Sequence, residues 1–292
     1  METYFQAAES AYDAHFADQW DSVFKALATS HSTDTMWLAG SSTYVFSIDG
    51  IKFAVDLQIR RKKDLEILSP RLQNDLAPLS FVLITHPHDD HLNPAFIRTV
   101  KDLPIRWFLP AGIGDKLIEA SEIPKDRLIL LKSGDVIEEG NLKIRAFYSP
   151  HVEADSKVAF PQLGYEITSP KGTVLLPGDV RDYSYRSYPH FGKIDLCISH
   201  LWGGQDPKDP NTYLPMLKEF AVFSAAFQAE RYFFTHLYEL GRKDRRAIWT
   251  YAHGGIAMDM LLELLPQSDA EIPRIGRAYS VFDENKETRT RK

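Results

Sequence analysis

The chain has 292 residues, of which 44% are hydrophobic and 25% charged, an ordinary composition for a globular protein with a sizeable core. Its formal net charge of −6 argues against a nucleic-acid partner, because proteins that hold a phosphate backbone usually carry a basic face. Cys197 is the only cysteine, so no internal disulfide can form, and a free thiol suits a reducing compartment. The sequence shows no signal peptide and no apolar run long enough to span a bilayer. We therefore expect a cytoplasmic protein with no membrane partner.

The first half of the chain alternates helical and strand-like patterns. Apolar side chains at helical spacing predict an amphipathic helix over about 2–28. A β-hairpin is predicted within TYVFSIDGIKFAVDLQ (43–58), because Asp49-Gly50 stands between two strand-like runs and both turn positions need positive φ. Asn93 before Pro94 is typical of a helix start. Further helices are predicted at 70–78 and 112–121, and strands at 81–85, 106–110 and 127–131.

The second half continues the alternation and then becomes helical. Strands are predicted near 141–149, 162–168, 172–176, 194–199 and 231–235. A helix is expected around 212–229, two more near 242–265, and a polar tail at about 283–292. No repeat or Gly/Ser linker interrupts the pattern. We predict one domain over 1–292, an α/β fold with two mixed sheets flanked by helices.

The stretch THPHDDHL (85–92) follows the apolar run FVLI and crowds titratable side chains into a few positions. Such a stretch is either a hydrated loop or half of a metal site. If FVLI is a buried strand, the stretch leaves its carboxyl end, where α/β folds place their sites. Imidazole and carboxylate groups at this density suit zinc, manganese or iron.

Three further residues stand in the same kind of place. His151 follows IRAFYSP, Asp179 follows TVLLPG, and His236 follows RYFFT. Taken singly, each of these residues is more often structural than functional. Their shared position at the ends of apolar strands favours a dinuclear metal site completed by distant parts of the chain.

In this arrangement the sequence resembles the metallo-β-lactamase superfamily of metallohydrolases. The resemblance rests on THPHDDHL, SPH (149–151), PGDV (177–180) and FTHLYE (234–239), in the family's order, and on the hairpin at 36–56. The opening Trp37-Leu38-Ala39-Gly40-Ser41 looks most like the ascorbate-phosphate lactonase-like subgroup. That subgroup commonly reads Trp-Leu-Gly-His-Ser, so the histidine is missing here, and Asp56 is followed by Leu57 instead of the usual proline.

The resemblance implies an αββα sandwich with two divalent metal ions, zinc or manganese, with iron as a third candidate. The implied ligands are His86, His88 and His151 for the first metal, Asp90, His91 and His236 for the second, and Asp179 as the bridge. Iron enzymes of the superfamily that reduce dioxygen or nitric oxide place glutamate where His88 stands, so this residue favours hydrolysis. A bridging hydroxide would then attack a carbonyl carbon or phosphorus.

Some residues near the implied site have open roles. Asp90 is a candidate proton relay, and Tyr183, or Tyr185, is a candidate donor to the substrate by likeness to the superfamily's lactonases. His200 ends a strand and is a packing residue, a substrate contact or, least favoured, a metal ligand. Asp89 is expected to point away from the metals.

Positive charges lie near the same segments. Arg181 or Arg186 is a candidate partner for an anionic substrate group, although the loop can also be a plain surface loop. The cluster Arg242–Arg246 is either a solvated helix face or a patch that steers anions.

The leading hypothesis is a metal-dependent hydrolase acting on a small molecule, such as a lactone or phosphorylated ester. The alternatives are a phosphodiesterase or nuclease on the same scaffold and, third, a metal-stabilised binding protein. Structural metal sites are normally closed, which disfavours the third. The sequence gives no indication of oligomeric state.

Overall fold

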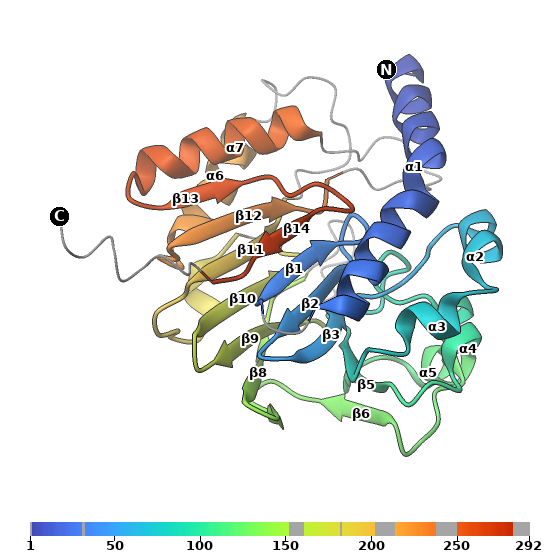
Figure 1. The fold of residues 1–292 in the computed structure, drawn as a ribbon. Helices are drawn as coiled ribbons and strands as arrows, with labels where there is room; N and C mark the ends of the chain where they lie inside the picture. The colour runs from blue at the N-terminus through green and yellow to red at the C-terminus, as the bar shows by residue number, and fades with distance from the viewer. Residues whose placement is uncertain are drawn as a thin grey trace.

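The computed structural model describes residues 2–30, 33–151, 161–181, 183–201, 214–237 and 250–282. Two seven-stranded sheets are stacked between two groups of helices (Figure 1). The fold is therefore the αββα arrangement predicted from the sequence. No helix in these ranges is both long and apolar enough to cross a membrane.

The first sheet is antiparallel at one side and parallel at the other. Strands β14, β1, β2 and β3 pair antiparallel, whereas β3 to β6 pair in parallel. In spatial order its strands are β14 (Ala278–Ser280), β1 (Thr35–Leu38), β2 (Tyr44–Ile48), β3 (Ile51–Val55), β4 (Phe81–Leu83), β5 (Arg106–Pro110) and β6 (Leu128–Leu131).

The second sheet has the same mixed character. Strands β7 to β10 pair antiparallel, and β10 to β13 pair in parallel. In spatial order its strands are β13 (Asp269–Glu271), β12 (Arg231–Thr235), β11 (Leu196–His200), β10 (Gly172–Gly178), β9 (Leu163–Ser169), β8 (Leu142–Tyr148) and β7 (Val136–Glu139).

Three apolar clusters separate the four layers. One lies between the sheets, where Phe46, Phe53 and Phe81 stack against one another. A second covers the outer face of the first sheet with α1 (Glu2–Thr29), α2 (Lys62–Leu68), α3 (Leu72–Leu76), α4 (Pro94–Val100) and α5 (Asp115–Ser121). The third covers the second sheet with α6 (Leu214–Ala225) and α7 (Tyr251–Leu264). This layering places the strand ends of both sheets along one edge of the sandwich.

Local rules explain several boundaries. Asp49 and Gly50 have φ of 50° and 78°, so they form the tight turn of positive φ that joins β2 to β3. The side chain of Asn93 accepts hydrogen bonds from the backbone N–H groups of Ala95 and Phe96 and caps α4. The N-terminal helix spans Glu2–Thr29, close to the predicted 2–28.

The sequence missed α2 and three short strands, β7, β13 and β14. One of the two helices expected near 242–265 appears as α7, while residues 238–249 lie outside the described part. The polar tail 283–292 and the cluster Arg242–Arg246 also lie outside it.

Candidate metal centre

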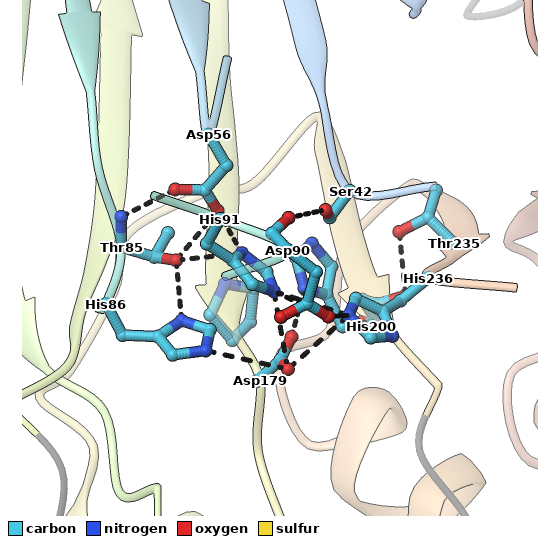
Figure 2. Close-up of polar contacts among 12 residues, drawn as sticks. Ser42, Asp56, Thr85, His86, Asp90, His91, Asp179, His200, Thr235 and His236 are labelled. Carbon is cyan, nitrogen blue, oxygen red and sulfur yellow. Dashed lines mark hydrogen bonds and ion pairs between the residues drawn. The ribbon is translucent and has the colours of Figure 1, made fainter. Parts of the chain in front are cut away.

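Histidine and aspartate side chains from both sheets meet at the ends of the strands. His86, Asp90 and His91 come from the loop after β4. The second sheet supplies residues after β8, β10 and β12 and the last residue of β11, which are His151, Asp179, His236 and His200. Figure 2 shows the side chains of this set that it labels pointing toward one another, namely His86, Asp90, His91, Asp179, His200 and His236. Since parallel strands end at one edge of a sheet, residues far apart in sequence come together here.

These side chains form four overlapping groups whose ligand atoms lie within 4.8 Å of one another. The groups are His86–His88–His151, His86–His91–Asp179, Asp90–His91–His236 and Asp179–His200–His236. All seven residues that the family pattern implied as ligands belong to them. The first and third groups are the two sets assigned to the two metals, and His200 joins the fourth.

The spacing within the groups fits small divalent cations. Nε2 of His91 and Nε2 of His236 are 3.3 Å apart, and Nε2 of His236 and Oδ2 of Asp90 are 3.4 Å apart. Four ligands at about 2.0–2.1 Å from a tetrahedral zinc ion are separated by about 3.3–3.4 Å. Nε2 of His86 and Nδ1 of His88 are slightly closer, at 3.0 Å. The donor set and its spacing therefore fit a metal centre.

The carboxylate of Asp179 lies between the two implied metal positions. Its Oδ2 atom is 3.9 Å from Nε2 of His86 and 3.5 Å from Nε2 of both His91 and His236. Its Oδ1 atom is 2.7 Å from Nδ1 of His200. One oxygen thus faces ligands of both groups, as a bridging carboxylate requires.

Burial keeps most of the imidazoles neutral. Loss of solvation lowers the pKa of His86 well below its ordinary value, lowers that of His88, and lowers that of His151 to about 4. A neutral imidazole has a free lone pair, so these three side chains are ready to bind a cation.

In the second group, neighbouring charges outweigh burial and shift the pKa values in the opposite direction. Burial alone would lower the pKa of His91, but the carboxylates of Asp179, Asp56 and Asp90 outweigh it and raise that pKa well above its ordinary value. Burial would raise the pKa of Asp179 and of Asp90, yet the nearby His91 and His236 hold both well below the ordinary range. The carboxylates are ionised and attract positive charge to this point.

Asp56 anchors the loop after β4 through hydrogen bonds, a role that was not anticipated from the sequence. Its carboxylate accepts hydrogen bonds from the backbone N–H and the hydroxyl of Thr85, each at 2.7 Å, and lies 2.7 Å from Nδ1 of His91 (Figure 2). Because an ionised carboxylate only accepts, Nδ1 of His91 donates and its Nε2 faces the metal position. Asp56 follows the apolar strand β3, the same placement that marked the ligands.

Two of these residues have left-handed backbone. Asp56 has φ of 50° and His236 has φ of 64°, a region that costs a residue with a side chain roughly 1 kcal/mol. The backbone N–H of His236 donates to the carbonyl of Ser41 at 3.0 Å, and Ser42 Oγ donates to the carbonyl of Asp90 at 2.7 Å. The loop between β1 and β2 thus fixes both ends of the second group.

Other predicted residues lie at the border of the centre. Asp89 is exposed and pairs with Arg60 at 2.9 Å, so its side chain points away from the cluster as expected. Tyr183 packs its ring against Phe220 and Phe223 of α6 and lines an open pocket with Pro215, Lys218 and Val222. Its predicted contact with substrate stays a prediction.

The remaining tyrosine and arginine candidates lie on either side of Tyr183 in the same segment. Tyr185 begins the 3₁₀ turn Tyr185–Ser187 and stacks on Tyr188. Arg186 is exposed, and Arg181 is partly buried. Their predicted contacts with an anionic substrate also stay predictions.

The N-terminal helix reaches the neighbourhood of the centre. Phe16, Trp20 and Phe24 are buried against the first sheet. Tyr12 and Phe16 also line a small pocket that includes Asp90, Ser41 and Arg60. Helix α1 therefore covers the sheet and forms one wall beside Asp90.

The fold and the site define a metallohydrolase-type αββα protein. Residues 55–237 match the family model described as "Beta-lactamase superfamily domain". The chain belongs to the metallo-β-lactamase superfamily. A search of curated protein sequences finds no match.

Solved structures share the fold at low sequence identity. CmlA, a diiron β-hydroxylase from Streptomyces venezuelae, is 14% identical with a TM-score of 0.60, over 86% of this chain and 55% of that one. The chain thus spans about half the length of this relative. The metallo-β-lactamase fold protein YhfI from Bacillus subtilis is 15% identical with a TM-score of 0.56, over 85% and 99%. A metallo hydrolase from Ignicoccus hospitalis is 15% identical with a TM-score of 0.54, over 87% and 100%.

Proposed function

We propose that the chain is a metal-dependent hydrolase with a dinuclear centre that acts on a small molecule. The observation that carries the proposal is the position of Asp179 Oδ2, within 3.5–3.9 Å of Nε2 atoms from both ligand groups. His86, His88 and His151 would hold one cation, Asp90, His91 and His236 the other, and Asp179 both. Zinc and manganese suit this donor set, and iron is the third candidate.

When bound, two divalent cations supply a water nucleophile whose pKa falls to about 7 and polarise the substrate oxygen. The chain's own groups prepare that chemistry. Apart from half-buried His88, the imidazole ligands and Asp179 are almost wholly buried, which excludes competing bulk water from most of the ligand positions.

Asp90 is the more exposed of the two carboxylates in the centre. Its side chain is 12% exposed, whereas those of His91, Asp179 and His236 are at most 3% exposed. Asp90 also lines the pocket beside α1. It is therefore the carboxylate best placed to pass a proton toward a leaving group.

We favour a lactone or a related ester, with or without a phosphate group, as the substrate class. The support is the likeness of residues 36–56 to the lactonase-like subgroup, together with the formal net charge of −6. His88 supports hydrolysis over oxidation, because the superfamily's oxygen-reducing iron enzymes carry glutamate at that position. The dinuclear centre suits phosphodiesters equally well, which makes phosphodiesterase activity the second candidate.

The test is a side-by-side assay. Purified protein is loaded with zinc, manganese or iron and offered a panel of lactones and a chromogenic phosphodiester, with oxygen uptake followed in parallel. Asp90→Ala and His88→Ala serve as blanks, and Asp89→Ala, which removes the exposed neighbouring carboxylate, is the matched control.

Lactone turnover that disappears in both blanks and persists in the control supports the proposal. Phosphodiester turnover with the same dependence moves the assignment to the second candidate. Oxygen uptake with iron and no hydrolysis under any loading contradicts hydrolysis, and would place the chain nearer to CmlA in chemistry as well as in fold.

A further inference from the structure

A buried chain of hydrogen bonds ends on the bridging carboxylate. Nδ1 of His200 lies 2.7 Å from Oδ1 of Asp179, and Nε2 of His200 lies 2.6 Å from the hydroxyl of Tyr44. The Tyr44 hydroxyl also lies 2.6 Å from Oγ1 of Thr235. All four side chains are at most 3% exposed. Tyr44 belongs to the first sheet, His200 and Thr235 end strands of the second, and Asp179 directly follows β10, so the chain of bonds crosses the sandwich.

The chemistry of these groups fixes the direction of the two bonds that His200 makes. An ionised carboxylate only accepts, so Nδ1 of His200 carries the proton and donates to Asp179. A neutral imidazole has one N–H, which leaves Nε2 as an acceptor for the Tyr44 hydroxyl. The Tyr44 oxygen can then accept from the hydroxyl of Thr235. By donating to Nε2, Tyr44 stabilises the tautomer of His200 whose Nδ1–H donates to Asp179.

In this arrangement the two carboxylate oxygens of Asp179 have different partners. Oδ1 is held by His200, while Oδ2 faces His86, His91 and His236. Rotation of the carboxylate would break the 2.7 Å bond to His200. The imidazole thus keeps Oδ2 in the shared position between the two ligand groups.

We propose that His200, oriented by Tyr44, is a positioning residue that fixes the Asp179 carboxylate so that Oδ2 is shared by both metal positions. The proposal rests on the metal centre of the proposed function and is independent of hydrolysis. The competing assignment makes His200 a ligand itself, since it belongs to one of the four groups of possible ligands.

Substitutions at His200 separate these assignments, because the amide nitrogen of asparagine takes the place of Nδ1 and that of glutamine the place of Nε2. His200→Asn keeps a donor to Asp179, whereas His200→Gln and His200→Ala lose it. Tyr44→Phe removes the group that selects the tautomer. Tyr232→Phe is the matched control, because it removes an equally buried hydroxyl that accepts from the Ala229 N–H near the start of β12.

The experiment measures zinc stoichiometry and affinity by competition with a chromogenic chelator, and the absorption spectrum of the cobalt-loaded protein. Circular dichroism confirms that each variant is folded. We expect a 10- to 100-fold loss of affinity for at least one zinc ion in His200→Gln, His200→Ala and Tyr44→Phe. We expect near-normal affinity and cobalt spectrum in His200→Asn and Tyr232→Phe.

Two results would overturn the proposal. If His200→Asn loses one metal as completely as His200→Ala and the cobalt spectrum changes in both, His200 is a ligand. If Tyr44→Phe and His200→Gln bind two metals as tightly as the unaltered chain, the hydrogen-bonded chain does not position Asp179. A protein that binds two zinc ions but hydrolyses nothing contradicts the proposed function and leaves this test intact, because the test reads binding. A protein that binds no metal contradicts both.

Discussion

Asp56→Asn tests how the loop after β4 is held in a state that can bind metal. The Asp56 carboxylate accepts three hydrogen bonds of 2.7 Å, two from Thr85 and one from Nδ1 of His91. Asparagine keeps one acceptor oxygen, and its NH₂ group cannot accept from Thr85 or His91. Facing this NH₂ group, Nδ1 of His91 can only accept a hydrogen bond. His91 then carries its proton on Nε2, the atom that faces His236 and Asp90.

The expected magnitudes follow from these contacts. Hydrogen bonds to a charged group contribute about 1.5–3 kcal/mol each, so loss of two should destabilise the metal-free protein by about 3 kcal/mol or more. Loss of the group that orients a histidine ligand should weaken metal binding about 10- to 100-fold. Zinc affinity by chelator competition and urea unfolding of the metal-free protein measure the two effects separately.

Asp195→Asn is the control for this substitution. Asp195 is also buried and accepts from the backbone N–H of Thr173 at 2.8 Å, but it belongs to none of the ligand groups. The Asp195→Asn protein should have a lower free energy of unfolding and unchanged zinc affinity. If Asp56→Asn binds both zinc ions as tightly as the unaltered protein, the reasoning about the His91 tautomer is wrong.

Three further predictions concern stability and turnover. Burial lowers the pKa of His151 from 6.5 to about 4, so the unfolded chain binds more protons than the folded chain between these pH values. The metal-free protein should therefore lose up to about 3 kcal/mol of its free energy of unfolding as the pH falls from about 6.5 to 4. Urea unfolding across this range measures the loss, and an equal slope in His151→Asn would contradict the prediction. Gly50→Ala places a side chain at φ of 78° in the β2–β3 turn and should destabilise the protein by about 1 kcal/mol in urea unfolding; an unchanged midpoint would contradict that account of the turn. Tyr183→Phe should reduce kcat for a lactone about 100-fold if the hydroxyl donates to the substrate carbonyl; an unchanged kcat would assign Tyr183 to packing against Phe220 and Phe223 alone.

Strong local patterns explain what the sequence predicted correctly. The strands RWFLP and RYFFT were predicted with their observed bounds, because continuous apolar runs mark strands that are buried on both faces. The Asp49-Gly50 turn and the Asn93 cap were predicted from short-range chemistry that needs no tertiary context. The predicted metal ligands stood out because each lies in a loop that follows such a strand, and the structure brings their side chains together.

The missed elements lack these patterns. Strands β13 and β14 have three residues each and alternate exposed and half-buried positions, and β7 reads VIEE, so none carries an apolar run. Helix α2 is short and begins with KKD, which reads as a polar loop. Pairing with a neighbouring strand or packing under α1 defines such elements, and neither is visible in a local window.

Asp56, Tyr44 and Thr235 were missed for a different reason. They act on the centre through His91 or His200, so their importance depends on contacts between residues up to 191 positions apart. Of these three, Asp56 had a detectable signal, because it directly follows the apolar strand β3, just as Asp179 and His236 follow β10 and β12. Tyr44 is indistinguishable from an ordinary aromatic residue at the start of a strand.

Metal stoichiometry tests the central claim most directly. Protein stripped with a chelator, incubated with excess zinc and desalted is analysed for zinc per chain, alongside His88→Ala, His236→Ala and Asp89→Ala. The account predicts two zinc ions per chain in the unaltered protein and in Asp89→Ala, and about one in each histidine variant, because the two histidines belong to different ligand groups. Less than one tightly held zinc ion per chain in the unaltered protein, or full loading of both histidine variants, would contradict it.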